Sequence, residues 1–343
     1  LNPGKLLLVD FETQQVIENN ELKSRIATQY PYKAWLAKHK IDLHLEQIGY
    51  QSSCLSETTI FKLQQQFGYT KEDINKYMSE LVTGKKDPIG AMGYDVPIAV
   101  LNEQPQSLFN YFKQLFAQVT NPPIDAYREK IVTSELSYLG AEGNILHPTP
   151  EALKRIQLQR PVLTPSQLEY IESSEFKTVR LSTLYTNVLA DALELLGQQA
   201  IEAVKDGAEI LVLDDSLLSQ KTAYALPILL ATSYIHQLLI KENLRMNTSI
   251  VAYSGETREV HHVACLLGYG ANVVVPYLAQ ATIEQLTVQK KLTGKVSNNV
   301  ETYTQILSEG VIKVMAKMGI STVQSYHGAQ IFEAIGLSHE VIE

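Results

Sequence analysis

The sequence contains only two cysteines, and they stand far apart. Cys54 and Cys265 have no further cysteine at a spacing suited to metal ligation. An iron–sulfur cluster or a structural zinc ion needs several such ligands, so this chain alone is not expected to hold either one. Isolated cysteines of this kind are typical of reduced thiols in a cytoplasmic protein, and Cys265 is expected to be buried in a helix.

Positive charge is also scarce. The 343 residues include 29 Lys and Arg against 37 Asp and Glu, which gives a formal net charge of −8. The chain lacks any run of basic residues that would follow phosphate groups, so neither nucleic acid nor an anionic membrane is an expected partner. With 45% hydrophobic and 19% charged residues, the composition is that of an ordinary globular protein of one large or two smaller domains.

No apolar run is long and uninterrupted enough to suggest a membrane span. The longest, Ala223–Ile240, is broken by Pro227 and contains His236 and several other polar residues. These features favour a buried helix. The chain shows no signal peptide, and Leu1 begins a stretch that reads as the middle of a protein, so we expect an excised fragment of a longer polypeptide.

The first 150 residues read as a hairpin followed by helices. The stretch KLLLVDFETQQVI predicts two short strands, which are rarely stable alone and so are expected to belong to a preceding domain's sheet. Thr70–Gly84 predicts a helix with a threonine N-cap and a glycine at its end. Pro122–Leu136 predicts a second helix that begins with proline, and Val96–Leu101 predicts a buried strand between the two.

A proline-rich connector separates this part from a regular α/β region. Nine of the thirteen prolines lie between Pro88 and Pro165, and the connector is placed at residues 144–165. Strands predicted at 176–182, 208–215, 247–254 and 271–277 are each followed by a helix. Such repeated βα units predict an α/β fold in which helices cover a parallel sheet. Four units fit half of an eight-stranded barrel or one open doubly wound sheet, and the pattern does not distinguish them.

Three polar clusters are candidates for chemistry. Asp214 and Asp215 end a predicted strand, where they would hold magnesium, act as a base, or serve as capping or solvated groups. Glu259, His261 and His262 follow another strand, but adjacent histidines on a helix point about 100° apart and do not easily chelate one ion. Helix-cap and interface roles are therefore the favoured interpretation. The later GYG stretch, 268–270, is better explained as a helix C-terminal turn than as a nucleotide-binding motif.

Several long motifs together resemble one enzyme family. DPIGAMGYDVPIAVL at 87–101, NYFKQLFAQVTNPPIDAYREKIV at 110–132 and SGETREVHHVACLLGYGANVVVPYLA at 254–279 closely resemble the central region of glutamate synthase large subunits. The likeness runs in order along the whole chain. It departs from the family at VLDDSLLSQK and AYALP, where members usually carry an arginine after the aspartate and a histidine before the proline.

The resemblance implies a role inside a larger oxidoreductase. Glutamate synthases make glutamate from glutamine and 2-oxoglutarate, with an N-terminal glutaminase domain and a later barrel domain that binds FMN and an iron–sulfur cluster. The central domain between them is a cofactor-free α/β unit, a degenerate relative of the flavin barrel. The implied organisation is the tail of the glutaminase domain at 1–30, a helical first half of the central domain at 31–150, and a βα-repeat second half at 151–343. The chain is then expected to be inactive alone.

The implied partners are the glutaminase and FMN-binding domains of the same polypeptide, with ammonia passing between them. In the family, loops corresponding to 87–95 and 115–123 lie near the mouth of an ammonia tunnel. The resemblance therefore suggests lining or gating residues, with glycines that shape the loop: Gly90, Gly93, Asp95, Thr120 and Asn121. Two other hypotheses stay open, namely a scaffold that conducts nothing and a freestanding α/β enzyme that uses Asp214, Asp215 and Glu259.

Overall fold

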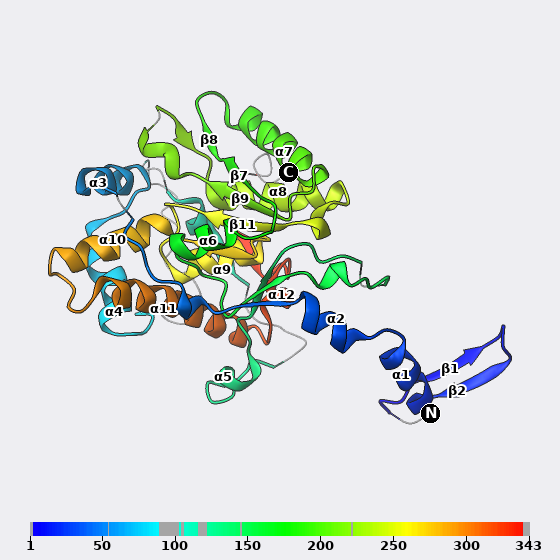
Figure 1. Cartoon of the computed structure of the whole chain (residues 1–343). Coiled ribbons are helices and arrows are strands. Elements are labelled where there is room, and N and C mark those ends of the chain that lie inside the picture. The colour runs from blue at the N-terminus through cyan, green and yellow to red at the C-terminus, as the bar shows by residue number, and fades with distance from the viewer. Residues whose placement is uncertain are drawn as a thin grey trace.

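A four-stranded parallel sheet forms the centre of the computed structural model, which describes residues 3–53, 55–88, 103, 106–115, 122–144, 146–220 and 222–338. The strand order across the sheet is β12-β11-β9-β7, and every neighbouring pair is parallel (Figure 1). The four strands are β7 (Thr178–Ser182), β9 (Ile210–Asp214), β11 (Ser249–Tyr253) and β12 (Val273–Val275).

Three helices link these strands and pack on one face of the sheet. They are α7 (Leu189–Lys205), α8 (Ile228–Lys241) and α9 (Val260–Gly268), and their apolar side chains join the largest core cluster. The strand order follows the chain order without a reversal, whereas a doubly wound sheet reverses at a switch point and places helices on both faces. The predicted βα repeats and parallel sheet are confirmed, and the doubly wound alternative is wrong.

The side chains of the central strands alternate between two cores. Leu211 and Leu213 of β9 belong to the cluster on the helical face, while Ile210 and Val212 belong to a second cluster on the opposite face. Successive side chains of a strand point to opposite faces, so a strand covered on both sides must be apolar throughout. This explains why the sequence ILVL shows no alternation of apolar and polar residues.

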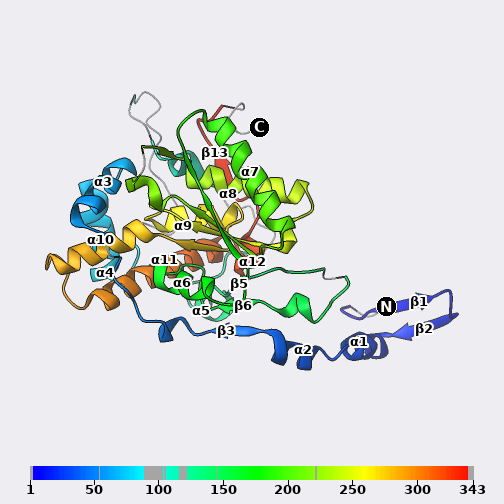
Figure 2. The same cartoon turned by 45° about the horizontal axis from the view of Figure 1, so that its top comes forward.

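A small sheet and one helix cover the second face. The sheet has the order β3-β6-β5, with β3 at Ile41–Leu43, β6 at Ile156–Leu158 and β5 at Ser137–Leu139 (Figure 2). Helix α6 (Pro165–Glu172) begins with a capping box, in which Thr164 and Gln167 satisfy each other's backbone N–H groups. Residue Val162, just before α6, forms an isolated parallel bridge with Val274 at the free side of β12.

Residues 55–88 and the C-terminal helices form a further helical layer (Figure 1). Thr70 caps the second helix as predicted: its Oγ1 accepts from the Asp73 N–H at 3.0 Å, and Asp73 Oδ2 accepts from the Thr70 N–H at 2.9 Å. Gly84 is the C-cap, although its φ of −79° is not left-handed. The helices are α3 (Glu57–Gln66), the π-helical η2 (Asp73–Met78), α4 (Ser79–Thr83), α10 (Tyr277–Val288), α11 (Val296–Lys317) and α12 (Val323–Tyr326).

The helix predicted at Pro122–Leu136 is mostly absent, and only α5 (Glu129–Val132) is α-helical there. Asp125 Oδ1 instead accepts from the backbone N–H groups of Tyr127 and Arg128 at 3.0 Å, which holds the chain in a turn. Short polar side chains compete with helical hydrogen bonding in this way. The strand predicted at Val96–Leu101 lies outside the described residues.

The predicted N-terminal hairpin is confirmed. Strands β1 (Leu7–Asp10) and β2 (Gln15–Glu18) pair antiparallel, followed by α1 (Asn19–Thr28) and α2 (Tyr32–His39). The hairpin projects away from the body of the molecule (Figures 1 and 2). The remaining short elements are η1 (Leu45–Gln47), η3 (Leu108–Tyr111), β4 (Phe112–Gln114), η4 (Glu151–Leu153), β8 (Leu184–Tyr185), η5 (Ser216–Gln220), β10 (Tyr224–Ala225), η6 (Arg245–Asn247) and β13 (Phe332–Ala334).

Candidate functional site

The polar residues singled out in the sequence meet at the carboxyl edge of the parallel sheet. Asp214 ends β9 and Asp215 follows it, while Ser254 and Gly255 follow the end of β11. Strands β9 and β11 are neighbours in parallel register, with Tyr253 opposite Asp214. This is the edge at which open α/β sheets usually bind their ligands, so its contents decide what the domain can do.

Asp215 is a buried carboxylate that joins two strand ends. It is 1% exposed, accepts the Ser254 hydroxyl at 2.6 Å, and accepts the Gly255 N–H at 2.9 Å. Burial raises the pKa of Asp215 to about 7, and the hydrogen bonds from Ser254 and Gly255 oppose this rise. All of these contacts lie within the chain, so the carboxylate connects the ends of β9 and β11 by hydrogen bonds, as a closed joint between the two strands.

Asp214 forms an ion pair that the sequence did not predict. Its Oδ2 is 2.7 Å from Arg180 Nη1, and Arg180 also donates two hydrogen bonds to Glu172 at 2.7 and 2.9 Å. The Arg180 guanidinium lies 4.7 Å from the centroid of the Tyr253 ring. The stretch SLLSQK just downstream of the aspartates holds no arginine, whereas Arg180 lies upstream on β7. The sequence feature that could have indicated this ion pair is the single arginine within the strand TVRLS.

Two charged residues of the loop after β11, Glu256 and Arg258, bind neighbouring elements. Glu256 accepts the N–H of Ile228, the first residue of α8, at 3.1 Å and the Ser107 hydroxyl at 2.8 Å. Burial raises the pKa of Glu256, and these two hydrogen bonds oppose the rise. A carboxylate at a helix N-terminus is favoured by the unpaired N–H groups and by the helix dipole.

Arg258 binds the turn between α3 and η2 at the carboxyl edge of the sheet. Its Nε lies 3.3 Å from Asp73 Oδ2, and its guanidinium lies 4.6 Å from the centroid of the Tyr69 ring. It also donates to the carbonyl oxygens of Phe67 and Gly68 at 3.4 Å. The Arg258 side chain is only 9% exposed, so removing one of its partners would leave a buried charge unpaired and destabilise the fold.

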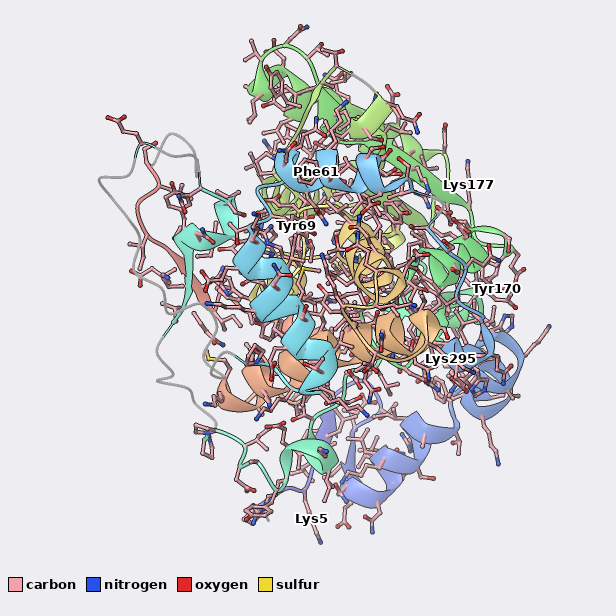
Figure 3. The ribbon with its side chains drawn as sticks, turned by 90° about the vertical axis from the view of Figure 1, so that its left-hand side faces the viewer. Lys5, Phe61, Tyr69, Tyr170, Lys177 and Lys295 are labelled. Carbon is pink, nitrogen blue, oxygen red and sulfur yellow. The ribbon has the colours of Figure 1, made fainter. Side chains whose placement is uncertain are left out.

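Aromatic side chains close the same edge. The Tyr69 hydroxyl donates to the Gly255 carbonyl at 2.8 Å, and Figure 3 shows Tyr69 where the chain turns between α3 and the next helix, below Phe61. A Cβ atom on Gly255 would lie 2.5 Å from the Phe67 ring and 2.9 Å from the Tyr277 hydroxyl. Any side chain at residue 255 would have to displace Phe67 or Tyr277, so the chain's own side chains occupy this part of the edge.

The paired histidines are packing residues. His261 Nε2 lies 3.0 Å from the Phe109 carbonyl oxygen, and the His262 ring stacks on the Phe109 ring with centroids 4.2 Å apart. Burial lowers the pKa of His261 to about 4 and lowers that of His262 well below its ordinary value, so both are neutral. Both histidines therefore pack against Phe109 within the chain, and Glu259 makes no side-chain cap to α9. Within the described ranges, no group of three His, Cys, Asp or Glu residues is placed to hold a metal ion.

The predicted tunnel residues lie outside the described residues. These are Gly90, Gly93, Asp95, Thr120 and Asn121. On either side of the second loop, the Leu115 N–H donates to the Ile331 carbonyl and the Ile124 N–H donates to the Ala316 carbonyl, both at 2.8 Å. The predicted helix C-terminal turn at 268–270 is confirmed, because α9 ends at Gly268 and Gly270 has a φ of 110°.

The model of one protein family matches most of the chain. It is described as the glutamate synthase central domain, and it matches residues 62–338. The chain belongs to this family. A second model, for class-II glutamine amidotransferases, matches residues 1–35, which include the hairpin of β1 and β2 in front of the glutamate synthase central domain.

Curated glutamate synthases match this chain over its full length. The large chain of the NADPH enzyme of Bacillus subtilis is 46% identical over 346 residues, and ferredoxin-dependent glutamate synthase 2 of Synechocystis is 37% identical over 361 residues. In both cases all of this chain is covered but only 23% of the relative, so the chain spans less than a quarter of these proteins. A solved flavocytochrome b2 mutant is 11% identical with a TM-score of 0.43, over 84% of this chain and 96% of that one, which is too low to establish a shared fold.

The alternative catalytic set does not form an accessible group in the glutamate synthase central domain. Asp215 is buried and bonded within the chain, and Asp214 is paired with Arg180. Glu259 lies near Arg258 and Asp73, and burial raises its pKa to about 7. Asp214 and Asp215 are thus held by different partners, and the Glu259 side chain is only 13% exposed. Among the described residues, no helix is both long and apolar enough to span a membrane.

Proposed function

We propose that this chain links the glutaminase and FMN-binding domains of a glutamate synthase and helps to form the ammonia path between them, without chemistry of its own. The match of the central domain model over residues 62–338 carries this proposal. The amidotransferase match at residues 1–35 supports the order of the domains. The isolated Cys265 thiol, buried and free of any disulfide, supports the cytoplasm as the compartment.

Ammonia sets the physical demands on such a path. Ammonia takes up a proton in bulk water, and ammonium is not a nucleophile towards the carbonyl of 2-oxoglutarate. A wall of glycine, proline and small polar groups excludes water and charge better than long ionic side chains do. The loops at 87–95 and 115–123 have this composition, and Asp95, Thr120 and Asn121 are the proposed lining or gating residues, with Gly90 and Gly93 shaping the first loop.

The cofactors of the parent enzyme belong to its other domains in this proposal. An iron–sulfur cluster needs several thiolates, whereas Cys265 is a lone, fully buried cysteine. A flavin phosphate at the carboxyl edge would need open backbone there, but even a Cβ atom on Gly255 would lie 2.5 Å from the Phe67 ring and 2.9 Å from the Tyr277 hydroxyl. Of the residues that the structure describes, Cys265 and the carboxyl edge around Gly255 therefore do not fit either group.

The domain also fits a degenerate barrel that has lost its flavin. Its central strands keep the consecutive order β7, β9, β11 and β12 with helices on one face, which is the winding found in a (βα) barrel. The proposed boundaries are residues 1–30 for the glutaminase tail, 31–150 for the first half of the central domain and 151–343 for the second half.

The test uses the full-length parent enzyme with Thr120→Val and Asp95→Ala. We expect glutamine hydrolysis to continue while glutamate formation falls, so that the ratio of the two rates rises. Thr186→Val and Asp191→Ala are matched controls, because both residues are exposed around the start of α7. If the loop variants kept the same ratio as the controls, the ammonia path would not run along these loops.

A further inference from the structure

A second polar region lies apart from the carboxyl edge. A cavity with a volume of about 640 Å³ opens between α5 and its following segment, the middle of α11, and residues 85–87 after α4. Cavities of this size commonly hold small ligands. The residues that bind Asp215 and Arg258 do not line it.

The inner wall of this cavity carries two polar atoms without partners. Thr133 is only 7% exposed, and its Oγ1 makes no hydrogen bond. Glu135 Oε2 is likewise buried and makes none. Buried polar atoms are nearly always paired, so two orphaned acceptors in one wall indicate a group that a bound molecule would supply.

Local backbone structure explains why these two side chains share a wall. Ser134 forms a parallel bridge with Thr322, and its N–H donates to the Ser321 carbonyl at 2.8 Å. Alternate residues of such an extended segment point to the same side. Thr133 and Glu135 therefore face the same way, and both line the cavity.

Each wall of the cavity carries charges of both signs. Glu135 lies close enough to Glu309 of α11 for their charges to interact, and burial together with that neighbour raises the pKa of Glu135 to about 7, opposed by Arg160. Arg160 itself donates two hydrogen bonds to Glu301, at 2.6 and 2.9 Å. The other charged groups that line the cavity are Lys85, Lys86, Asp87, Glu129, Lys130 and Lys313.

We propose that this cavity binds a small molecule with both a primary ammonium group and a carboxylate, which is the chemistry of a free α-amino acid. An ammonium group donates three hydrogen bonds, and Thr133 Oγ1 and Glu135 Oε2 are acceptors without other partners. The ligand carboxylate meets the lysines from the other two walls, Lys85, Lys86 and Lys313. This binding site goes beyond the proposed ammonia path and does not depend on it.

The same charges argue against two simpler ligand classes. A diamine would place its second ammonium group among the lysines, and a dicarboxylate would place one carboxylate beside Glu135 and Glu309. Like charges in a partly buried site repel each other. A ligand with one group of each sign avoids both repulsions, because its ammonium group lies beside Glu135 and its carboxylate beside the lysines.

The test is isothermal titration calorimetry of the chain with L-glutamine, L-glutamate, putrescine, succinate and ammonium chloride as separate probes. We expect an amino acid to bind and the diamine, the dicarboxylate and ammonium alone to bind at least about tenfold more weakly. Failure of both amino acids to bind, or equal binding by putrescine, succinate or ammonium, would overturn the proposal.

Two variants locate the binding in this cavity. Glu135→Gln and Thr133→Val should each weaken amino-acid binding by about tenfold or more, while Glu242→Gln, at the exposed end of α8, should leave it unchanged. If Glu135→Gln does not fold, Glu309→Gln on α11 replaces it with the same expected loss. Unchanged affinity in the cavity variants would place the ligand elsewhere and refute the assignment.

Protonation gives an independent readout. A bound ammonium group favours the ionised form of Glu135, so binding near pH 7 should release protons and the affinity should rise between about pH 6 and pH 8. Titrations in buffers of different ionisation enthalpy measure this release. Glu135→Gln should abolish it, and proton release that persists in this variant would contradict the proposed contact.

Discussion

Replacing Asp215 with asparagine tests whether the carboxyl edge of the sheet is a closed joint. The carboxylate is 1% exposed, and burial raises its pKa from an ordinary 3.8 to about 7. One pKa unit corresponds to about 1.4 kcal/mol, so ionising Asp215 costs on the order of 4 kcal/mol more in the folded chain than in the unfolded chain. The asparagine side chain would keep an oxygen for the Ser254 hydroxyl and the Gly255 N–H but would carry no charge.

The sign of the pH dependence follows from this raised pKa. The folded chain binds the Asp215 proton more tightly than the unfolded chain does, so this stabilisation is complete below about pH 4 and is lost as the pH rises to about 7. Asp215→Asn removes that dependence. Relative to wild type, we expect little change near pH 4 and a gain of roughly 2–4 kcal/mol in the free energy of unfolding near pH 8.

Urea unfolding of both proteins across this pH range measures the difference directly. Subtracting the two profiles removes contributions that they share, including those of the other buried carboxylates. Asp214→Asn is the matched control, because Asp214 is ion-paired with Arg180 and its loss should give no gain near pH 8. If Asp215→Asn were less stable than wild type near pH 8, the ionised carboxylate would be required there and the closed-joint interpretation would be refuted.

Three further predictions concern the loop after β11 and helix α9, which follows it. Gly255→Ala should lower the free energy of unfolding by roughly 1–3 kcal/mol, because its Cβ would lie 2.5 Å from the Phe67 ring, and wild-type stability in urea would show that the ring can move. Arg258→Met should lower the free energy of unfolding by roughly 2–4 kcal/mol, since it leaves the Asp73 charge without its partner. Limited proteolysis should then cut this variant first near residues 67–73, and an unchanged cleavage pattern would contradict the prediction. Cys265 is fully buried and burial raises its thiol pKa, so an aromatic disulfide reagent should label it only at the rate of unfolding, and rapid labelling of the native chain would argue against the packing of α9.

The features that the sequence predicted well are local or periodic. The strands around ILVLD and SIVAY were recognisable because a strand buried on both faces must be apolar along its length. The cap at Thr70 was recognisable because its partner, Asp73, lies three residues away. Each of these interactions is complete within a few residues.

The contacts that define the candidate site are of another kind. Arg180 and Asp214 are 34 residues apart, and Tyr69 reaches Gly255 across 186 residues. No local pattern records such a pairing, because it arises only when the strands take their places in the sheet. The helix predicted at residues 122–136 was wrong for a local reason. A single turn that begins at Asp125 outweighed the helix-forming residues around it.

The path of the chain before residue 53 has a mechanical consequence. Strand β3 is inserted beside β6, parallel to it, in the small sheet that covers the core. Helix α2 also contacts η4 ahead of this strand, so the chain is held to the body at two successive places. A pull along β3 would shear its hydrogen bonds to β6 together, because those bonds lie across the strand direction. Motion of the hairpin relative to the body is therefore expected to begin before α2, around residues 29–31, and not within the small sheet.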